Sequence, residues 1–435
     1  MKADVAVAAA GQLLEKLAAL AVLMVLTRYV PAERLGDYFL AVSTAGLAGV
    51  LTSMGTTAAL NRGVARDPEQ AGQLLGRVLS VRLPLVVAAY GLIVGVTAVA
   101  APRLVAVMAL ASGYTLLGNL WFSFSAVLLG LRRVRWQVVL ALTAPALQVA
   151  LVPLAAAWGW AFEHILLLLV GSNLLMLAVT LVVVRRCVGP APVRWPTRLA
   201  WSFALGSWPF LAMTTLRAAN FRIDTMMVYA LGSAAEAAAY ETAFKLLEVT
   251  QLMMRPVTMV FFPVCSAMVA QRLWPRLRRA MRGLVVLPLV LGAVVGLGVG
   301  VLAPWLMPMI WGESYAGREG VLRVLMISVP VLWTCLVASF LAASLGAEKR
   351  IAAGQAVALL VNVGMNAMIV PILGAVGAAW TTLATQGVLC VWLLGVVWRT
   401  FAASAAADDP APSRPETDAA GATAIAESAA PRVNP

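Results

Sequence analysis

The sequence predicts an all-α polytopic membrane protein with twelve transmembrane helices in two pseudo-symmetric six-helix lobes around a central cavity. Three observations predict this fold. The chain of 435 residues is 62% hydrophobic and only 12% charged, whereas a soluble protein is about a quarter charged. It contains twelve apolar runs, and about 20 residues are enough for a helix to cross a bilayer. Basic residues are abundant in every second loop between these runs and scarce in the others.

The expected spans follow one another with short connections along most of the chain. They are 6–27, 36–58, 80–100, 103–129, 137–158, 162–184, 203–231, 237–264, 284–306, 320–345, 351–372 and 375–398. The first run is too long for a signal-peptide core and contains Glu15 and Lys16, so we interpret it as an uncleaved helix. Between the last two runs, the segment from Pro371 to Trp380 must make a tight turn.

The distribution of basic residues predicts the orientation in the membrane. With the N-terminus in the cytoplasm, the cytoplasmic segments contain twenty basic residues and the opposite side contains five. This bias follows the positive-inside rule and places both termini in the cytoplasm. Arg82, near the start of the third run, is counted here as a cytoplasmic loop residue. No basic stretch is interleaved with aromatic residues for base stacking, so we do not expect nucleic acid as a partner.

The chain divides into two lobes and a tail. We expect an N-terminal lobe at 1–186, a C-terminal lobe at 187–400 and a disordered cytoplasmic tail at 401–435, where Ala, Pro and acidic residues dominate. An internal repeat supports the two lobes, because Gln148 and Asn366 share an offset of 218 residues in matching runs that both end in proline. Such a repeat is parallel, and transporters place their substrate at the interface between repeats.

Nine ionisable residues fall inside the predicted spans. They are Glu15, Lys16, Arg217, Arg222, Asp224, Glu241, Lys245, Glu248 and Arg255. A charge at the centre of a bilayer costs about 2.5–3.5 kcal/mol on insertion scales, so these side chains must face protein or water. They occur in only three spans, which predicts one shared location.

Helical spacing refines this location. Residues three or four apart share a helix face, so Glu241, Lys245 and Glu248 should form one stripe, which Arg255 continues. Asp224 can then pair with Lys245 or Arg222. Two interpretations remain open: the charges bind a substrate, or they form buried ion pairs that fix helix packing. A guanidinium group is planar and permanently charged, which makes it suitable for holding phosphate.

Catalytic signatures are absent from the sequence. It contains no GxxxxGK[ST], HExxH or GxSxG motif, and its four cysteines are far apart. The sole histidine, His164, lies in a predicted outer loop. The outer loops are short, whereas an enzyme acting on lipid-linked sugars usually needs a larger external domain. We therefore expect a carrier with no catalytic residue, metal or cofactor.

Three stretches resemble the Wzx-type polysaccharide flippases of the multidrug/oligosaccharidyl-lipid/polysaccharide (MOP) exporter superfamily. The first contains Arg28, Gly36, Tyr38, Gly55 and Arg62. The second contains Asp224, Gly232, Tyr240 and Ala243. The third contains Gly346, Asn362, Asn366, Pro371, Gly374 and Gly377. The individual motifs are loose, but their order and spacing cover nearly all of residues 1–400.

This resemblance implies a flippase that moves an undecaprenyl-diphosphate-linked oligosaccharide across the bacterial inner membrane by alternating access, for cell-surface polysaccharide biosynthesis. The residues implied to bind the diphosphate are Arg217, Arg222, Lys245, Arg255 and Lys16. Those implied to balance charge or couple an ion are Glu15, Asp224, Glu241 and Glu248. Membrane lipid, a polysaccharide polymerase and assembly proteins are the implied partners.

Other functions stay open at this point. A multidrug or cation antiporter of the same superfamily usually depends on an acidic residue in its first helix, and Glu15 would fit that role. A membrane polymerase or ligase of lipid-linked sugars is a further alternative, although no large outer loop is present. The lipid II flippase branch normally has two helices more than this chain.

Overall fold

The computed structural model describes residues 2–191, 193 and 198–407, and this part of the chain contains helices but no strand. The α-helices are α1 (Lys2–Tyr29), α2 (Ala32–Ser53), α3 (Thr56–Arg66), α4 (Ala71–Ala100), α5 (Val105–Gly130), α6 (Val134–Ala157), α7 (Phe162–Val188), α8 (Arg198–Gly206), α9 (Trp208–Leu231), α10 (Ala234–Leu252), α11 (Arg255–Ala270), α12 (Trp274–Trp311), α13 (Glu319–Ile327), α14 (Val329–Ser344) and α15 (Glu348–Ala407). Three short 3-10 helices are η1 (Pro68–Gln70), η2 (Pro102–Leu104) and η3 (Glu313–Tyr315).

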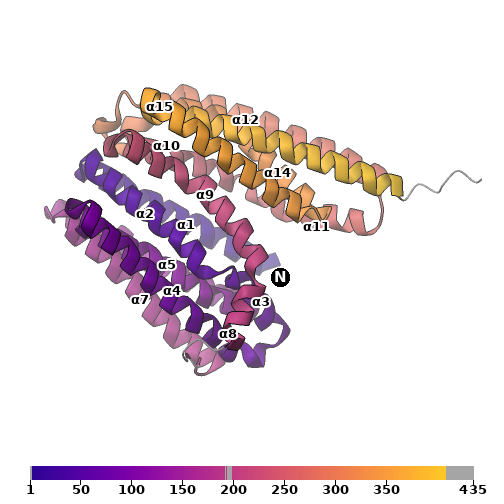
Figure 1. The fold of residues 1–435 in the computed structure, drawn as a ribbon, viewed down its shortest axis with the longest axis horizontal. Helices are drawn as coiled ribbons and strands as arrows, with labels where there is room; N and C mark the ends of the chain where they lie inside the picture. Colours follow the sequence, from indigo (N-terminus) through magenta and orange to yellow (C-terminus); the bar gives the residue numbers. More distant parts are fainter. Residues whose placement is uncertain (1, 192, 194–197, 408–435) are drawn as a thin grey trace, which may run out of the picture.

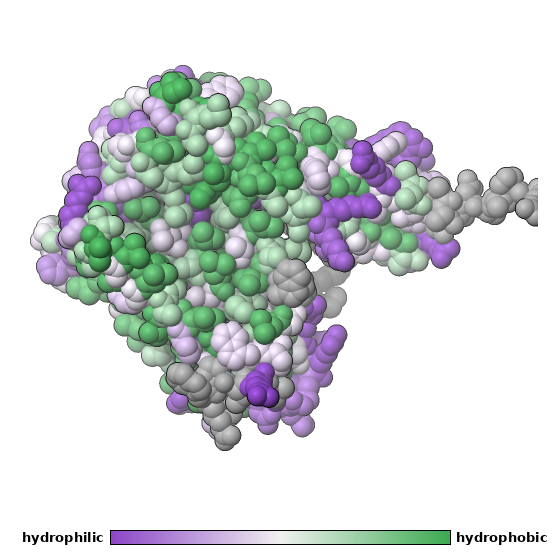
Figure 2. All heavy atoms as spheres, in the orientation of Figure 1, coloured by the Kyte–Doolittle hydropathy of each residue, from purple (hydrophilic) through white to green (hydrophobic). Residues whose placement is uncertain are grey.

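The surface of the protein is that of a multi-pass membrane protein. Large apolar side chains point outward along the long helices, such as Val87, Leu297 and Leu360. Hydrophobic residues cover most of the face in Figure 2, and hydrophilic residues gather toward its left and right ends. In the described residues, eight helices are long and apolar enough to cross a membrane, or nine if the bent pair α13 and α14 forms one span. The count of twelve spans stays a prediction.

Several predicted spans are interrupted by a break in the helix. The run 36–58 breaks at Met54 and Gly55, which both have positive φ. Three further runs break at or just after positions 207, 253 and 328, where new helices begin. In each of these three helices a proline occupies the first turn, where its missing N–H breaks no helical hydrogen bond. A single uninterrupted helix over 237–264 is therefore wrong, and the continuation of the Glu248 stripe by Arg255 stays a prediction.

Arg82 does not lie in a loop. Helix α4 begins at Ala71, so Arg82 lies well inside this helix, and only 2% of its surface is exposed. Its assignment to the cytoplasmic loop residues is therefore wrong. The third predicted span thus contains a buried arginine in addition to the nine ionisable residues identified from the sequence.

The helices form two bundles (Figure 1). Helices α1 to α7 make up one bundle and α10 to α15 the other, and α9 runs between them. Helix α1 packs against α6, and α9 packs against α15. These two pairs contain the first and fifth predicted spans of the two halves, so the halves share this contact, as the predicted repeat requires. Helix α15 reverses direction at Gly374, with φ 55°, where the sequence requires a tight turn. The boundary between lobes at 186 and 187 stays a prediction.

The two bundles touch at one end of the molecule. A Cβ atom on Gly36 of α2 would lie 1.9 Å from the carbonyl oxygen of Ala234 in α10, so only glycine permits this approach. The Tyr229 hydroxyl of α9 donates a hydrogen bond of 2.6 Å to Asp37 of α2. From this contact the bundles diverge toward the other end, where α3, α8, α11, the N-terminus and the end of α15 lie (Figure 1).

The first seven residues of the predicted tail are helical. Residues 401–407 are the last turns of α15, so disorder from 401 onward is wrong for these seven positions. They continue the helix because its apolar side chains still pack, with Phe401 buried against Trp274. Residues 408–435 lie outside the described part of the chain.

Candidate functional site

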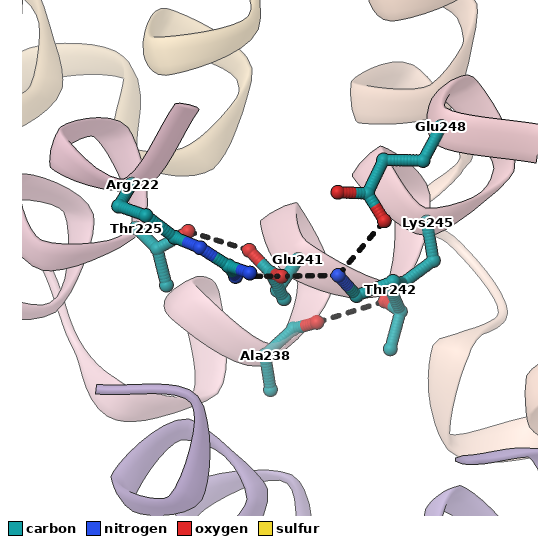
Figure 3. Close-up of polar contacts among 7 residues, drawn as sticks. All are labelled: Arg222, Thr225, Ala238, Glu241, Thr242, Lys245 and Glu248. Atoms are coloured by element: carbon teal, nitrogen blue, oxygen red, sulfur yellow. Dashed lines mark hydrogen bonds and ion pairs between the residues drawn. The ribbon is translucent and has the colours of Figure 1, made fainter. Parts of the chain in front are cut away.

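Glu241 is the centre of an ion-pair cluster between α9 and α10 (Figure 3). One carboxylate oxygen lies 2.9 Å from Lys245 Nζ and 3.5 Å from Arg222 Nη1. The other oxygen accepts a hydrogen bond of 2.6 Å from the Thr225 hydroxyl. Lys245 also pairs with Glu248 at 3.1 Å. The predicted stripe of Glu241, Lys245 and Glu248 on one helix face is therefore confirmed.

Three charged residues of this cluster, Glu241, Lys245 and Glu248, line a cavity of about 180 Å³ between the two bundles. Lys16 of α1 lies on one wall, and Glu241, Lys245 and Glu248 of α10 lie on another. Tyr38, Tyr114 and Gln148 add polar groups from the N-terminal bundle. This cavity brings Lys16 and Lys245 to one space from opposite halves of the chain, as the sequence predicts.

The balance of charge in this central cavity differs from the cationic cavity implied by the resemblance. The charged residues of its lining are two lysines and two glutamates. Lys245, 23% exposed, lies between the two carboxylates and is already neutralised. An incoming anion would have to replace one of these carboxylates as the partner of Lys245. The two glutamates therefore neutralise the cation of α10 within the protein itself.

Asp224 forms a separate buried centre. Its side chain is 2% exposed and accepts hydrogen bonds from Asn362 at 2.8 Å and Asn366 at 2.6 Å. The hydroxyls of Tyr240 and Thr382 donate to its second oxygen at 2.9 and 3.2 Å. The expected pairing of Asp224 with Lys245 or Arg222 is therefore wrong, because Glu241 takes both cations.

Neutral donors alone surround the Asp224 carboxylate in the described part of the chain. A buried charge without a counter-ion is costly, so this group favours a proton or a monovalent cation. The Asn366 Oδ1 atom has no hydrogen-bond partner beside it and could accept from such a ligand. The sequence signal for this centre is the pair Asn362 and Asn366, four residues apart in an apolar run. Their spacing alone does not show that Asp224 is their hydrogen-bond partner.

The remaining predicted residues lie elsewhere. Arg217 lines a cavity of about 230 Å³ in the C-terminal bundle, together with Asn220 and Gln355. Glu15 lines a larger cavity on the side of the N-terminal bundle, which Lys16 also reaches. The Arg255 side chain lies outside the described residues. One shared location for all the charges is therefore wrong, since they occupy at least three sites.

The family of the chain follows from its sequence. The profile of a family described as "Polysaccharide biosynthesis protein" matches residues 1–269. The chain belongs to this family. No curated protein sequence matches it closely enough to count as a relative.

Solved structures share the fold of this family member. An inward-facing multidrug resistance MATE family transporter of the MOP superfamily is 17% identical, with 91% of this chain and 96% of that chain covered and a TM-score of 0.69. The lipid II flippase MurJ, in an inward closed conformation, is 13% identical over 92% and 90% of the two chains, with a TM-score of 0.69. An outward-facing MATE transporter is 16% identical, with 92% of this chain and 94% of that chain covered and a TM-score of 0.62. The resemblance to the MOP superfamily is thus confirmed at the level of the fold.

Proposed function

We propose that the protein is a flippase for a polyprenyl-diphosphate-linked oligosaccharide, working by alternating access in the bacterial inner membrane. The observation that supports this most directly is the central cavity with its charged lining, in a chain that belongs to the polysaccharide biosynthesis family. Lys16 and Lys245 face this cavity from the two bundles, so one diphosphate can bridge them. The glycan would occupy the space between the bundles, and the polyprenyl chain would stay in the lipid.

Substrate binding proceeds by an exchange of partners at Lys245. In the empty cavity, Glu241 and Glu248 hold its ammonium group at 2.9 and 3.1 Å. A phosphate oxygen makes the same charge-assisted hydrogen bond and displaces Glu248, the more exposed of the two carboxylates. Glu241 keeps Arg222 and Thr225 as partners, and the displaced Glu248, which is 23% exposed and lines the cavity, turns toward water.

The open end of the molecule faces the cytoplasm in this proposal. The basic loops and both ends of the described chain lie there, which fits the positive-inside rule. The higher similarity to the inward-facing than to the outward-facing MATE transporter supports the same orientation. The contact of Gly36 with Ala234 then closes the outer side.

Asp224 is the ion-coupling residue of the proposed cycle. Its carboxylate is accessible only through movement of α9, α10 or α15, which supply all its partners. Binding or release of a proton or a monovalent cation would change how these three helices pack. Because α9 and α10 also hold the Glu241 cluster, the two centres are mechanically connected.

Reconstitution tests the proposed function. Wild-type protein in vesicles should move a fluorescent polyprenyl-diphosphate disaccharide between leaflets, and Lys16→Gln and Lys245→Gln should reduce the rate at least tenfold. Lys349→Gln is the matched control, because Lys349 is exposed at the start of α15. Equal rates in the two cavity variants and the wild type would exclude the assigned site. Transport of a cationic dye instead of the lipid would favour the antiporter alternative.

A further inference from the structure

A large cavity lies on the side of the N-terminal bundle, next to the central one. Its volume is about 920 Å³, far above the ~30 Å³ that one water molecule occupies. Helices α1 to α6 contribute to its wall, and Thr214 of α9 also lines it. Lys16 lines both this cavity and the central one, so the two spaces are neighbours.

Arg82 is the buried cation of this cavity. Its Nη1 atom donates to the Ser123 hydroxyl at 2.7 Å and its Nη2 atom to the Asn119 carbonyl oxygen at 2.6 Å. Its Nε atom has no hydrogen-bond partner. Both acceptors are neutral, and no carboxylate of the described residues forms an ion pair with this guanidinium group.

A packing role alone does not account for this arrangement. A buried charge without an opposite charge is strongly destabilising, and neutral acceptors compensate it only in part. The charged residues lining the cavity are Lys16, Arg62 and Arg82, with Glu15 as the one carboxylate. This lining therefore has an excess of positive charge, in contrast to the balanced lining of the central cavity.

The wall beside Arg82 is also kept open. Gly49 lines the cavity, and a Cβ atom at this position would lie 2.6 Å from the Asn119 side chain. A larger residue would displace the Asn119 side chain, whose Nδ2 atom donates to the Thr115 carbonyl oxygen at 3.0 Å, on the same residue whose main-chain carbonyl accepts from Arg82. Gly49 thus lets α2 pack closely against Asn119 of α5 in the wall that also contains Arg82.

We propose that this cavity is a second anion-binding site, in which Arg82 binds the diphosphate of the lipid-linked substrate before that group reaches Lys245. The proposal rests on the proposed function and extends it from one site to two. Lys16 borders both cavities, so it can remain in contact with the diphosphate while the group passes from Arg82 to Lys245. Glu248 is then displaced from Lys245 by an anion that is already bound nearby.

Equilibrium binding tests the second site. The full-length protein in detergent is titrated with geranylgeranyl diphosphate, inorganic diphosphate and geranylgeraniol, and heat release is measured. The wild type should bind two equivalents of the lipid diphosphate. Arg82→Gln should weaken one binding event by roughly tenfold or more, as expected for a lost charge-assisted hydrogen bond, and Lys245→Gln should weaken the other.

A second variant protects the test against misfolding of Arg82→Gln. Thr57 lines the same cavity, and Thr57→Asp adds a negative charge there without removing a hydrogen bond of Arg82. It should weaken the same binding event, whereas the neutral Thr57→Asn should retain both events.

Four outcomes would overturn the second site, and the last of them would overturn the proposed function with it. If Arg82→Gln and Thr57→Asp both bind the lipid diphosphate as tightly as the wild type, the cavity binds no diphosphate. In that case, a loss of lipid diphosphate binding in Lys245→Gln alone would leave the proposed function intact. Arg82-dependent binding of geranylgeraniol would identify an apolar site. Arg82-dependent binding of inorganic diphosphate, without the lipid diphosphate, would identify a site for a free anion. Failure of the wild type to bind any lipid diphosphate would contradict the proposed function as well.

Discussion

Replacing Glu241 by glutamine separates a substrate site from a purely structural ion-pair cluster. Glutamine preserves the shape of the side chain and can still accept the hydrogen bond from Thr225, but it removes the charge. Lys245 and Arg222 then lose the carboxylate that they share. The variant should therefore be less stable when empty and should bind an anion more tightly.

The distances give the size of the effect. At an effective dielectric constant of about 20, Coulomb's law gives about 6 kcal/mol for the 2.9 Å contact with Lys245 and about 5 kcal/mol for the 3.5 Å contact with Arg222. The two cations are 23% and 28% exposed, so water screens part of this sum. Loss of one partner from a buried pair typically costs about 3–5 kcal/mol, which lowers the melting temperature of a chain of this size by roughly 3–6 °C.

Thermal unfolding in detergent, with and without geranylgeranyl diphosphate, measures both effects. The empty variant should melt below the wild type, and saturating ligand should raise its melting temperature by more than that of the wild type. A tenfold gain in affinity adds about 1.4 kcal/mol of stabilisation at the same ligand concentration. Glu163→Gln is the control, because its ion pair with Arg34 is one-third exposed or more and contributes at most about 1 kcal/mol. An equal ligand-induced shift in Glu241→Gln and wild type would refute the exchange of partners at Lys245.

Three further changes test other parts of the structure. Asp224→Asn should preserve the melting temperature but remove the response of transport to an imposed proton or sodium gradient, and a wild-type gradient response would contradict ion coupling at this carboxylate. Tyr229→Phe removes the 2.6 Å hydrogen bond to Asp37, which contributes about 1.5–3 kcal/mol. Spin-label distances between α2 and α10 should broaden at the outer end, and an unchanged distribution would show that this bond does not hold the closed side. Gly374→Ala should lower the melting temperature, because φ is 55° and the new Cβ would lie 2.2 Å from a carboxylate oxygen. Gly364→Ala in the same helix meets no atom within 4 Å and should not lower it.

Local patterns in the sequence predicted the parts of the structure that depend on neighbours along the chain. The reversal at Gly374 follows from a proline and glycines between two apolar runs. The stripe of Glu241, Lys245 and Glu248 follows from the helical repeat, and their ion pairs confirm it. Composition and loop charges similarly identified a polytopic membrane protein.

Contacts between distant segments could not be predicted in this way. The partners of Asp224 include Asn362 and Asn366, which follow it by 138 and 142 residues. Spacing therefore suggested the nearby cations Arg222 and Lys245 instead. Arg82 was missed because an arginine near the start of an apolar run resembles a loop residue. Only the early start of α4 and its packing against α5 make it a buried cation.

The equal numbers of positive and negative groups around the central cavity have an electrical consequence. A carrier whose lining sums to zero returns without substrate at no electrical cost, whereas a bound diphosphate makes the moving unit negative. Each elementary charge that crosses the full membrane potential contributes about 2.3 kcal/mol per 100 mV. Under the proposed function and for the charges of the central cavity alone, a negative cell interior would push the loaded carrier outward and leave the empty carrier free to return, which would give the proposed cycle a direction even before any coupling ion is considered.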